Sequence, residues 1–260
     1  MRALSSGMLL GVPTTTAPRI ARSKIDSAKE QMLNVSKNRT ADDTRAQRRI
    51  PGTYVQFGCG LCAPTTWLNF DAGPAFWLEK NLPFLKPLLL RRGFPDYPAN
   101  IRYGNVIEGL PVAPGTVDGV YCSHVLEHLA LNEFRRAVRN VYSYLVPAGT
   151  FRFVLPDLEW LASSYLNSPD SEAASRFMRE SDLGVHERSG GISGSMKLVF
   201  GRSAHLWMWD YKNMARELEA AGFTGIRRAQ FHDNPDLRFL DVEDIGRWEN
   251  CLGVECRKQG

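Results

Sequence analysis

Short apolar runs alternate with helical segments between residues 51 and 160. The runs are rich in β-branched and aromatic residues, and they predict strands at residues 53–57, 67–71, 100–103, 118–122 and 150–155. A Leu-rich stretch over residues 74–90 and a second stretch over residues 131–145 are interpreted as helices, and residues 147–149 as a turn. Strands that alternate with helices in this way are typical of a parallel α/β sheet.

The pattern changes after Pro156. Asp157 is expected to begin a helix, because a carboxylate suits the positive first turn. Residues 166–204 are polar and rich in Gly and Ser, and we interpret them as a lid-like insertion. A final helix over residues 211–221 should stop at Gly222, and two more strands are expected near residues 225–229 and 252–256.

Residues 1–50 show no sustained periodicity and carry the excess of positive charge. They hold ten Lys and Arg against four acids, a net charge of +6, whereas the remaining residues come to −2. We therefore predict a basic N-terminal arm over residues 1–50 and one domain over residues 51–260. The arm is either solvated or docks on an acidic partner or an anionic membrane surface.

Charge and composition also exclude some classes of protein. A slightly acidic domain does not favour nucleic-acid binding. No apolar stretch is long enough to cross a bilayer, and the five cysteines are too few for a disulfide framework. We expect a cytoplasmic protein whose membrane contact, if any, is peripheral through the arm. The pattern leaves the oligomeric state open.

Two glycines follow the first predicted strand. Gly58 and Gly60 end the run Val55-Gln-Phe-Gly-Cys-Gly. Glycine accepts positive φ and has no Cβ, so the backbone of such a turn can lie close to a ligand at the carboxyl edge of the sheet. Asp71 ends the next predicted strand, where a carboxylate can accept hydrogen bonds from ribose hydroxyls. A turn or helix-cap role is the alternative for Asp71.

Ordered motifs give the chain a family resemblance. Their order is Val55-Gln-Phe-Gly-Cys-Gly, then Trp67-Leu-Asn-Phe-Asp, then Leu110-Pro, then Ser123-His-Val-Leu-Glu-His. Later segments, among them His205-Leu-Trp-Met-Trp-Asp, continue it to about residue 258. The set resembles the class I methyltransferases that use S-adenosylmethionine, specifically a small group often linked to polysaccharide biosynthesis.

The resemblance implies a fold, a cofactor and a substrate class. The fold is a Rossmann-like, doubly wound α/β sheet of seven strands, mostly parallel with one antiparallel strand. The cofactor is S-adenosyl-L-methionine, and the acceptor is a small molecule or a carbohydrate-linked group. The implied cofactor-binding residues are Gly58, Cys59 and Gly60 for the methionine part, Asp71 for the ribose, Asn105 and Val106 for the adenine, and Ser123 and His124 beneath the sulfonium.

Two positions depart from the family pattern. Asn105 replaces the acid on the adenine side, although its side-chain oxygen can still accept a hydrogen bond from the adenine amine. The usual third glycine is absent from the region of Cys62 and Ala63. These departures leave open a catalytically weak or inactive binding protein with the methyltransferase fold.

A histidine is the natural general base for an oxygen or nitrogen acceptor, since its pKa lies near neutrality. We predict His128 and His205 as candidates, and Asp210 as a third whose alternative role is helix capping. The aromatic residues Trp207, Trp209 and Tyr211 either contact a ring substrate or pack in the core.

One rival interpretation comes from Cys59 and Cys62. They form a CxxC pair, which could serve redox chemistry or bind a metal with the distant Cys251 and Cys256. No second CxxC is present, and a turn between two glycines leaves little room for the helix that stabilises a reactive thiolate. We therefore predict no metal site.

Overall fold

The structure is a computed structural model that describes residues 52–184 and 204–260. The predicted arm over residues 1–50 lies outside the described residues, as does much of the predicted lid. Within the described residues, no helix combines the length and the apolarity needed to cross a membrane.

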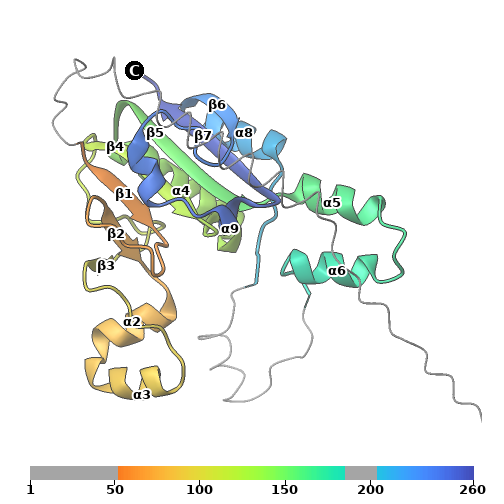
Figure 1. Ribbon diagram of the computed structural model, residues 1–260. Coiled ribbons are helices and arrows are strands. Elements are labelled where there is room, and N and C mark those ends of the chain that lie inside the picture. Colours follow the sequence, from red (N-terminus) through yellow and green to blue (C-terminus); the bar gives the residue numbers. More distant parts are fainter. Residues whose placement is uncertain (1–51, 185–203) are drawn as a thin grey trace, which may run out of the picture. The chain divides into compact units, whose positions relative to one another are not determined.

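Seven strands form one sheet in the order β3-β2-β1-β4-β5-β7-β6 (Figure 1). Strand β7 is antiparallel to both of its neighbours, and the other pairs are parallel. The predicted fold class, including its single antiparallel strand, is therefore confirmed. The strands are β1 Tyr54–Phe57, β2 Leu68–Asp71, β3 Ile101–Tyr103, β4 Val117–Ser123, β5 Leu145–Pro156, β6 Phe223–Ala229 and β7 Cys251–Lys258.

The helices are found mostly where the apolar spacing predicts them. The α-helices are α2 Pro74–Asn81, α3 Lys86–Arg91, α4 Leu131–Tyr144, α5 Leu158–Leu166, α6 Ala173–Glu180, α8 Tyr211–Ala220 and α9 Ile245–Trp248. Short 3₁₀ helices are η1 Pro83–Leu85, η2 Leu126–His128 and η3 Leu237–Asp241. Asp157 caps α5, as expected, by accepting the backbone N–H groups of Glu159 and Trp160.

Alternation along the strands builds two apolar layers. On β5, Phe151 and Phe153 belong to the larger core, which the buried faces of α4 and α8 complete. Val154, on the other face, belongs to a second core with Phe239 of η3 and Trp248 of α9. Because side chains of a strand alternate between faces, one apolar strand contributes to both layers.

Three elements differ from the sequence-based expectation. The helix predicted over residues 74–90 is broken, because Pro83 and Pro87 interrupt it and η1 separates α2 from α3. The expected turn at residues 147–149 lies within β5, where the register against β4 shifts and Ala148 has a φ of 61°. Helix α6 lies within the predicted lid, in a stretch whose polar composition gave no helix signal.

A buried charge network lies on the face of β5 that carries the second core. Arg152 is fully buried, and its guanidinium contacts Glu243, Asp233 at 2.7 Å and Glu255 at 2.9 Å. Glu255 is its register partner on β7, and the Trp248 ring lies 4.7 Å from the guanidinium carbon. One side chain of β5 thus connects β7 with the segments that carry Asp233 and Glu243.

Replacing Arg152 by methionine should destabilise the protein severely. The change leaves the buried carboxylate of Glu243 without its cation and removes one of the two guanidinium partners of Glu255, and an uncompensated buried charge typically costs about 3–5 kcal/mol. Urea denaturation measures the free energy of unfolding. Arg135→Met is the matched control, because Arg135 pairs with Glu217 on a partly exposed surface and water screens that pair. Equal losses for both variants would contradict the assignment of the network as a structural centre.

Candidate active site

The register of three parallel strands brings their carboxyl ends together. Phe57 of β1 pairs with Phe70 of β2 and with Cys122 of β4. The next residue of each strand or turn is Gly58, Asp71 and Ser123, respectively. These three residues therefore emerge side by side at the edge of the sheet where α/β folds bind their ligands.

The Asp71 carboxylate fixes the glycine turn. Its Oδ2 accepts the backbone N–H of Gly60 at 2.9 Å, and its Oδ1 accepts that of Gly73 at 2.7 Å. Asp71 is only 8% exposed. One side chain thus ties the end of β2 to the turn that follows β1, while each oxygen keeps a lone pair for a ligand.

The two glycines of the turn are required for different reasons. Gly58 has a φ of 62°, and a Cβ there would lie 2.2 Å from a methyl carbon of Val125. Gly60 has a φ of 55°, and no described atom would lie within 4 Å of its Cβ. Gly58 therefore allows close packing within the protein, whereas the absent side chain of Gly60 leaves open space.

That open space belongs to a cavity of about 420 Å³, which we call the glycine cavity. Its volume is typical of small-molecule and cofactor sites. Most of the predicted cofactor-binding residues line it, and they come from the ends of β1, β2 and β4 and from the loop after β3: Gly58, Gly60, Asp71, Asn105, Val106, Ser123 and His124.

Cys59 is not among the described residues that line the glycine cavity. The positive φ values on both sides turn its side chain away, and it packs with Phe76 and Ile101 instead. Burial raises the pKa of the Cys59 thiol to about 12. Burial also raises the pKa of Cys62. Because the thiolate is the reactive form, this pair is unsuited to the redox role that its spacing suggests.

The loop after β3 is held by Asn105. Its side-chain oxygen accepts the backbone N–H of Ile107 at 2.9 Å, so it caps the loop from within. The backbone carbonyls of Val106 and Ile107 in turn accept hydrogen bonds from Asn140 of α4. Asn105, which stands in place of the family's acid, therefore stabilises the loop, and a lone pair on its side-chain oxygen remains for a ligand.

A second cavity, of about 610 Å³, adjoins the first, and we call it the histidine cavity. Both cavities are lined by His124, His128 and Arg247. The histidine cavity extends from these three residues to Asp182 before the undescribed segment and to His205 after it. The two cavities thus share a wall at the end of β4.

His124 begins this shared wall with a φ of 54°, a strained value for a residue with a Cβ. Its Nε2 lies 2.9 Å from the carbonyl oxygen of Arg247, and its Nδ1 lies 3.2 Å from Oε1 of Glu127. Burial alone would lower the pKa of His124. Its contacts with Cys251, Glu127 and the Arg247 carbonyl outweigh burial and raise the pKa to about 10.

Glu127 is the most unusual residue of the site. It is fully buried, and among the described residues its carboxylate has the ion-pair contact with His124 but no hydrogen bond of good geometry to either oxygen. Its backbone carbonyl accepts the N–H groups of Leu206 at 2.8 Å and Trp207 at 3.1 Å. Those two bonds hold the returning chain against η2 and bring His205 to the carboxylate.

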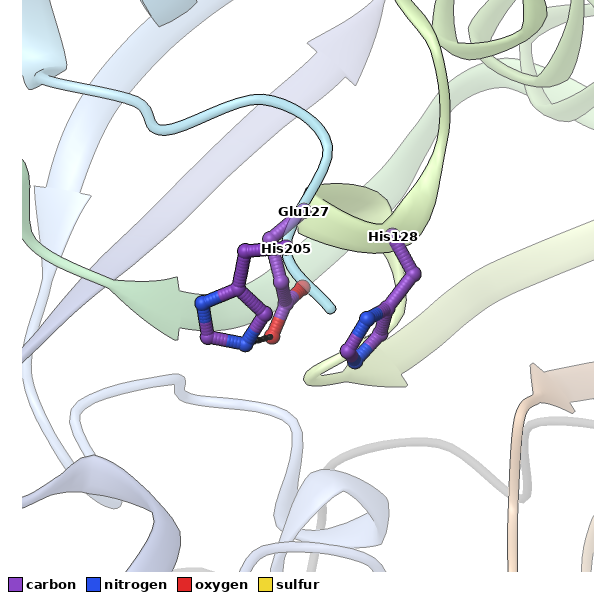
Figure 2. Close-up of side chains that lie close together, drawn as sticks. All are labelled: Glu127, His128 and His205. Carbon is purple, nitrogen blue, oxygen red and sulfur yellow. Dashed lines mark ion pairs between the residues drawn. The ribbon is translucent and has the colours of Figure 1, made fainter. Parts of the chain in front are cut away.

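Figure 2 shows His128 and His205 on either side of the Glu127 carboxylate. The two imidazole rings lie 4.9 Å apart, and Nε2 of His205 lies 4.0 Å from Oε1 of Glu127. Nδ1 of His205 donates to the carbonyl oxygen of Ser181 at 2.7 Å, which leaves Nε2 with its lone pair. Burial lowers the pKa of His205, so the neutral ring is favoured.

The third predicted catalytic residue lies elsewhere. Asp210 caps α8 by accepting the N–H of Asn213 at 2.8 Å, and neither cavity has it among its described lining residues. Trp209 is fully buried and packs on Phe134, and Tyr211 donates to the carbonyl oxygen of Ile226. These aromatic residues therefore follow the core-packing alternative.

Sequence reasoning missed Glu127, Arg247 and Asp182. Glu127 did carry a signal, because a charged residue stands inside the otherwise apolar run Val125-Leu-Glu-His-Leu. Arg247 and Asp182 carried none, since each lies in a short polar stretch that reaches the cavities only through the tertiary fold. Glu127 lies only three residues from His124, whereas Arg247 reaches His124 and Asp182 reaches His205 from distant parts of the sequence.

Comparison with known proteins gives a family and several similar chains. Residues 55–153 match the family model of a methyltransferase domain. The uncharacterized protein YBR225W of Saccharomyces cerevisiae is 24% identical over 152 residues, which are 55% of this chain. The chain spans 17% of the length of that relative.

Among solved structures, a methyltransferase of Methanosarcina mazei is 13% identical, with a TM-score of 0.44 and coverage of 80% of this chain and 92% of that one. The 1,6-didemethyltoxoflavin-N1-methyltransferase of Burkholderia thailandensis is 12% identical, with a TM-score of 0.39 and coverage of 96% and 94%. The match over residues 55–153 agrees with the class that the ordered motifs predict, and S-adenosylmethionine is the cofactor of that class.

Proposed function

We propose that this protein transfers the methyl group of S-adenosylmethionine to a small-molecule or carbohydrate-linked acceptor. The observation that carries the proposal is the pair of adjoining cavities at the carboxyl edge of the sheet. The glycine cavity would hold the cofactor and the histidine cavity the acceptor. Their shared wall of His124, His128 and Arg247 would then lie between donor and acceptor.

The glycine cavity suits a nucleoside with a charged amino-acid tail. Gly60 offers backbone without a side chain, and Asp71 offers acceptor lone pairs for ribose hydroxyls. Ser123 lines the same cavity at the end of β4. Asn105 and Val106 would flank the adenine, and His124 would lie beneath the sulfonium.

When bound, S-adenosylmethionine supplies an electrophilic methyl group, so the protein's own contribution is alignment and removal of water. The histidine cavity contributes polar groups that converge on an acceptor. His128 and His205 are the side chains that we assign to the reacting end of the acceptor, where a neutral ring can accept its proton. Asp210 is not included, because its oxygen already caps α8.

The ribose assignment predicts that Asp71→Asn weakens binding of S-adenosylhomocysteine by about 10- to 100-fold, because hydrogen bonds to a charged group contribute about 1.5–3 kcal/mol. Isothermal titration calorimetry measures the affinity. The matched control is Asp118→Asn, whose carboxylate accepts the N–H of Thr53 at the other end of β4 and should leave affinity unchanged. An unchanged affinity of Asp71→Asn would refute the ribose role, and a wild-type chain that fails to bind would refute the whole proposal.

The open space at Gly60 predicts that a side chain at this position weakens the binding of S-adenosylhomocysteine. Gly60→Ala and Gly115→Ala each place a Cβ at positive φ, with no described atom within 4 Å, so both should lose about 1–2 kcal/mol of stability to backbone strain. Of these two glycines, Gly60 lines the glycine cavity and Gly115 is not among its described lining residues. We expect Gly60→Ala alone to weaken S-adenosylhomocysteine binding, by about tenfold or more. Similar affinities for the two variants, with similar thermal melting, would count against a ligand beside Gly60.

A further inference from the structure

Three potential ligand atoms meet in the histidine cavity, next to the wall that it shares with the glycine cavity. They belong to Glu127 and His128 of η2 and to His205, and they lie within 4.8 Å of one another (Figure 2). The geometry points to a divalent transition-metal site formed by these three side chains, with its open side toward the histidine cavity. The binding of the ion is independent of the proposed function, but the task assigned to the ion rests on it.

The buried carboxylate is the first reason for this assignment. A carboxylate removed from water needs hydrogen bonds or a positive charge to offset the loss of hydration. The described residues give Glu127 one positive partner, His124, and no hydrogen bond of good geometry to either oxygen, although the residue has no exposed surface. His124 lies 3.2 Å from Oε1 on one side, and the opposite side faces the two other histidines. A cation there would complete the set of partners.

The orientation of the imidazole rings is the second reason. A metal-binding histidine usually donates its other N–H to a carbonyl or carboxylate, which fixes the ring and its tautomer. His205 does this through Nδ1, which donates to Ser181 at 2.7 Å, so that Nε2 carries the lone pair near Glu127. One ring nitrogen of His128 lies 3.4 Å from the carbonyl oxygen of Ala204, which is a weaker tether of the same kind.

The set of donors selects the kind of ion. Two imidazoles with one carboxylate suit Zn²⁺, Fe²⁺ or Mn²⁺ and leave coordination positions open, whereas Mg²⁺ and Ca²⁺ prefer oxygen ligands. Donors that share one ion at about 2.1 Å lie roughly 3–3.5 Å apart. The separations here are 4.0 Å between His205 and Glu127 and at most 4.8 Å within the set, so the three side chains would move closer together when the ion binds. Asp182, 3.8 Å from the same His205 nitrogen, offers a further oxygen.

An ion at this place would bind the acceptor and define its class. The open positions face the histidine cavity, so the ligand would be a hydroxyl oxygen of an acceptor such as a sugar. A bound cation lowers the pKa of that hydroxyl, and its proton would pass to cavity water. As the oxygen forms its bond to the methyl carbon, the carbon–sulfur bond breaks and its electron pair stays on sulfur. His128 and His205 would then act as ligands rather than as general bases.

Zinc titration of the metal-free full-length chain tests the site. We expect the wild-type protein to bind one equivalent of Zn²⁺ in calorimetry. Glu127→Gln and His205→Gln should each weaken that binding by about tenfold or more, because each removes a ligand. Zinc binding that is absent from the wild-type chain, or unchanged in both variants, would overturn the proposal.

Matched controls separate this site from other zinc-binding groups. Glu249→Gln removes a charge from the lining of the same cavity, and His232→Gln removes an exposed histidine elsewhere. Both should bind Zn²⁺ as the wild type does. Cys62→Ser should also leave binding unchanged, and the cobalt(II) complex should lack the intense charge-transfer absorption of a thiolate ligand. Loss of binding in Cys62→Ser would assign the zinc to the cysteines and overturn the proposal.

The shift in melting temperature on adding Zn²⁺ measures binding for each variant separately, so a variant that is less stable can still be compared with the wild type. Without metal, the melting temperature of each protein serves as its own reference, because Glu127→Gln removes a buried charge and also the ion-pair partner of His124. Added Zn²⁺ should raise the melting temperature of the wild type but not that of Glu127→Gln. Equal zinc-induced shifts in both proteins would contradict the site.

Affinity for S-adenosylhomocysteine, measured on the same samples, keeps the two proposals apart. A chain that binds S-adenosylhomocysteine but not Zn²⁺ would overturn the cation site and leave the proposed function in place. A chain that binds Zn²⁺ through Glu127 and His205 but not S-adenosylhomocysteine would support the site and overturn the methyl-transfer task.

Discussion

The parallel register of β2, β1 and β4 is the constraint on which the site depends. With Phe57 opposite Phe70 and Cys122, the strand ends deliver the glycine turn, Asp71 and Ser123 to one edge of the sheet. A slip of one residue would separate the Asp71 carboxylate from the N–H of Gly60 and turn the apolar side chains of the strand to the wrong face. The core therefore enforces the register, and the register builds the glycine cavity, so that packing and ligand geometry are consequences of the same pairing.

One buried residue of the site, Glu127, is costly for the stability of the fold. Glu127 is buried beside His124 and His205, and its own backbone carbonyl anchors the chain at residues 206–207. An apolar residue at this place would fill the volume without desolvating a charge. The carboxylate is thus better explained by what it does at the boundary of the two cavities than by what it adds to the folding energy. The Arg152 network is different, because every carboxylate there meets a guanidinium or an amide.

Much of the fold and the glycine side of the site could be predicted from the sequence. The features that could not be predicted depend on contacts between distant residues or on backbone conformation. The strands, the glycine turn and Asp71 are local features, because each follows from apolar runs, turn chemistry and the position of an acid at a strand end. The direction of the Cys59 side chain depends on the φ values of both neighbouring glycines, which sequence composition does not reveal. The meeting of Glu127 with His205 depends on two backbone hydrogen bonds across about eighty residues, and the break of the helix after Asn81 on how two prolines are accommodated.

The same difference between local features and distant contacts explains why the sequence indicates the class of the protein more clearly than its substrate. The described lining of the glycine cavity comes from strand ends and the residues that follow them within residues 57–129, next to recognisable motifs, with Arg247 added from a distant segment. The histidine cavity is assembled from η2, the start of α5, the segment before residue 184, the segment after residue 204 and the loop before β7. No short motif can encode a surface that five separate segments supply. If the proposed function holds, an acceptor would be selected by tertiary contacts, above all those that hold His205 against Glu127, and segments that line the histidine cavity alone could change without altering the glycine cavity.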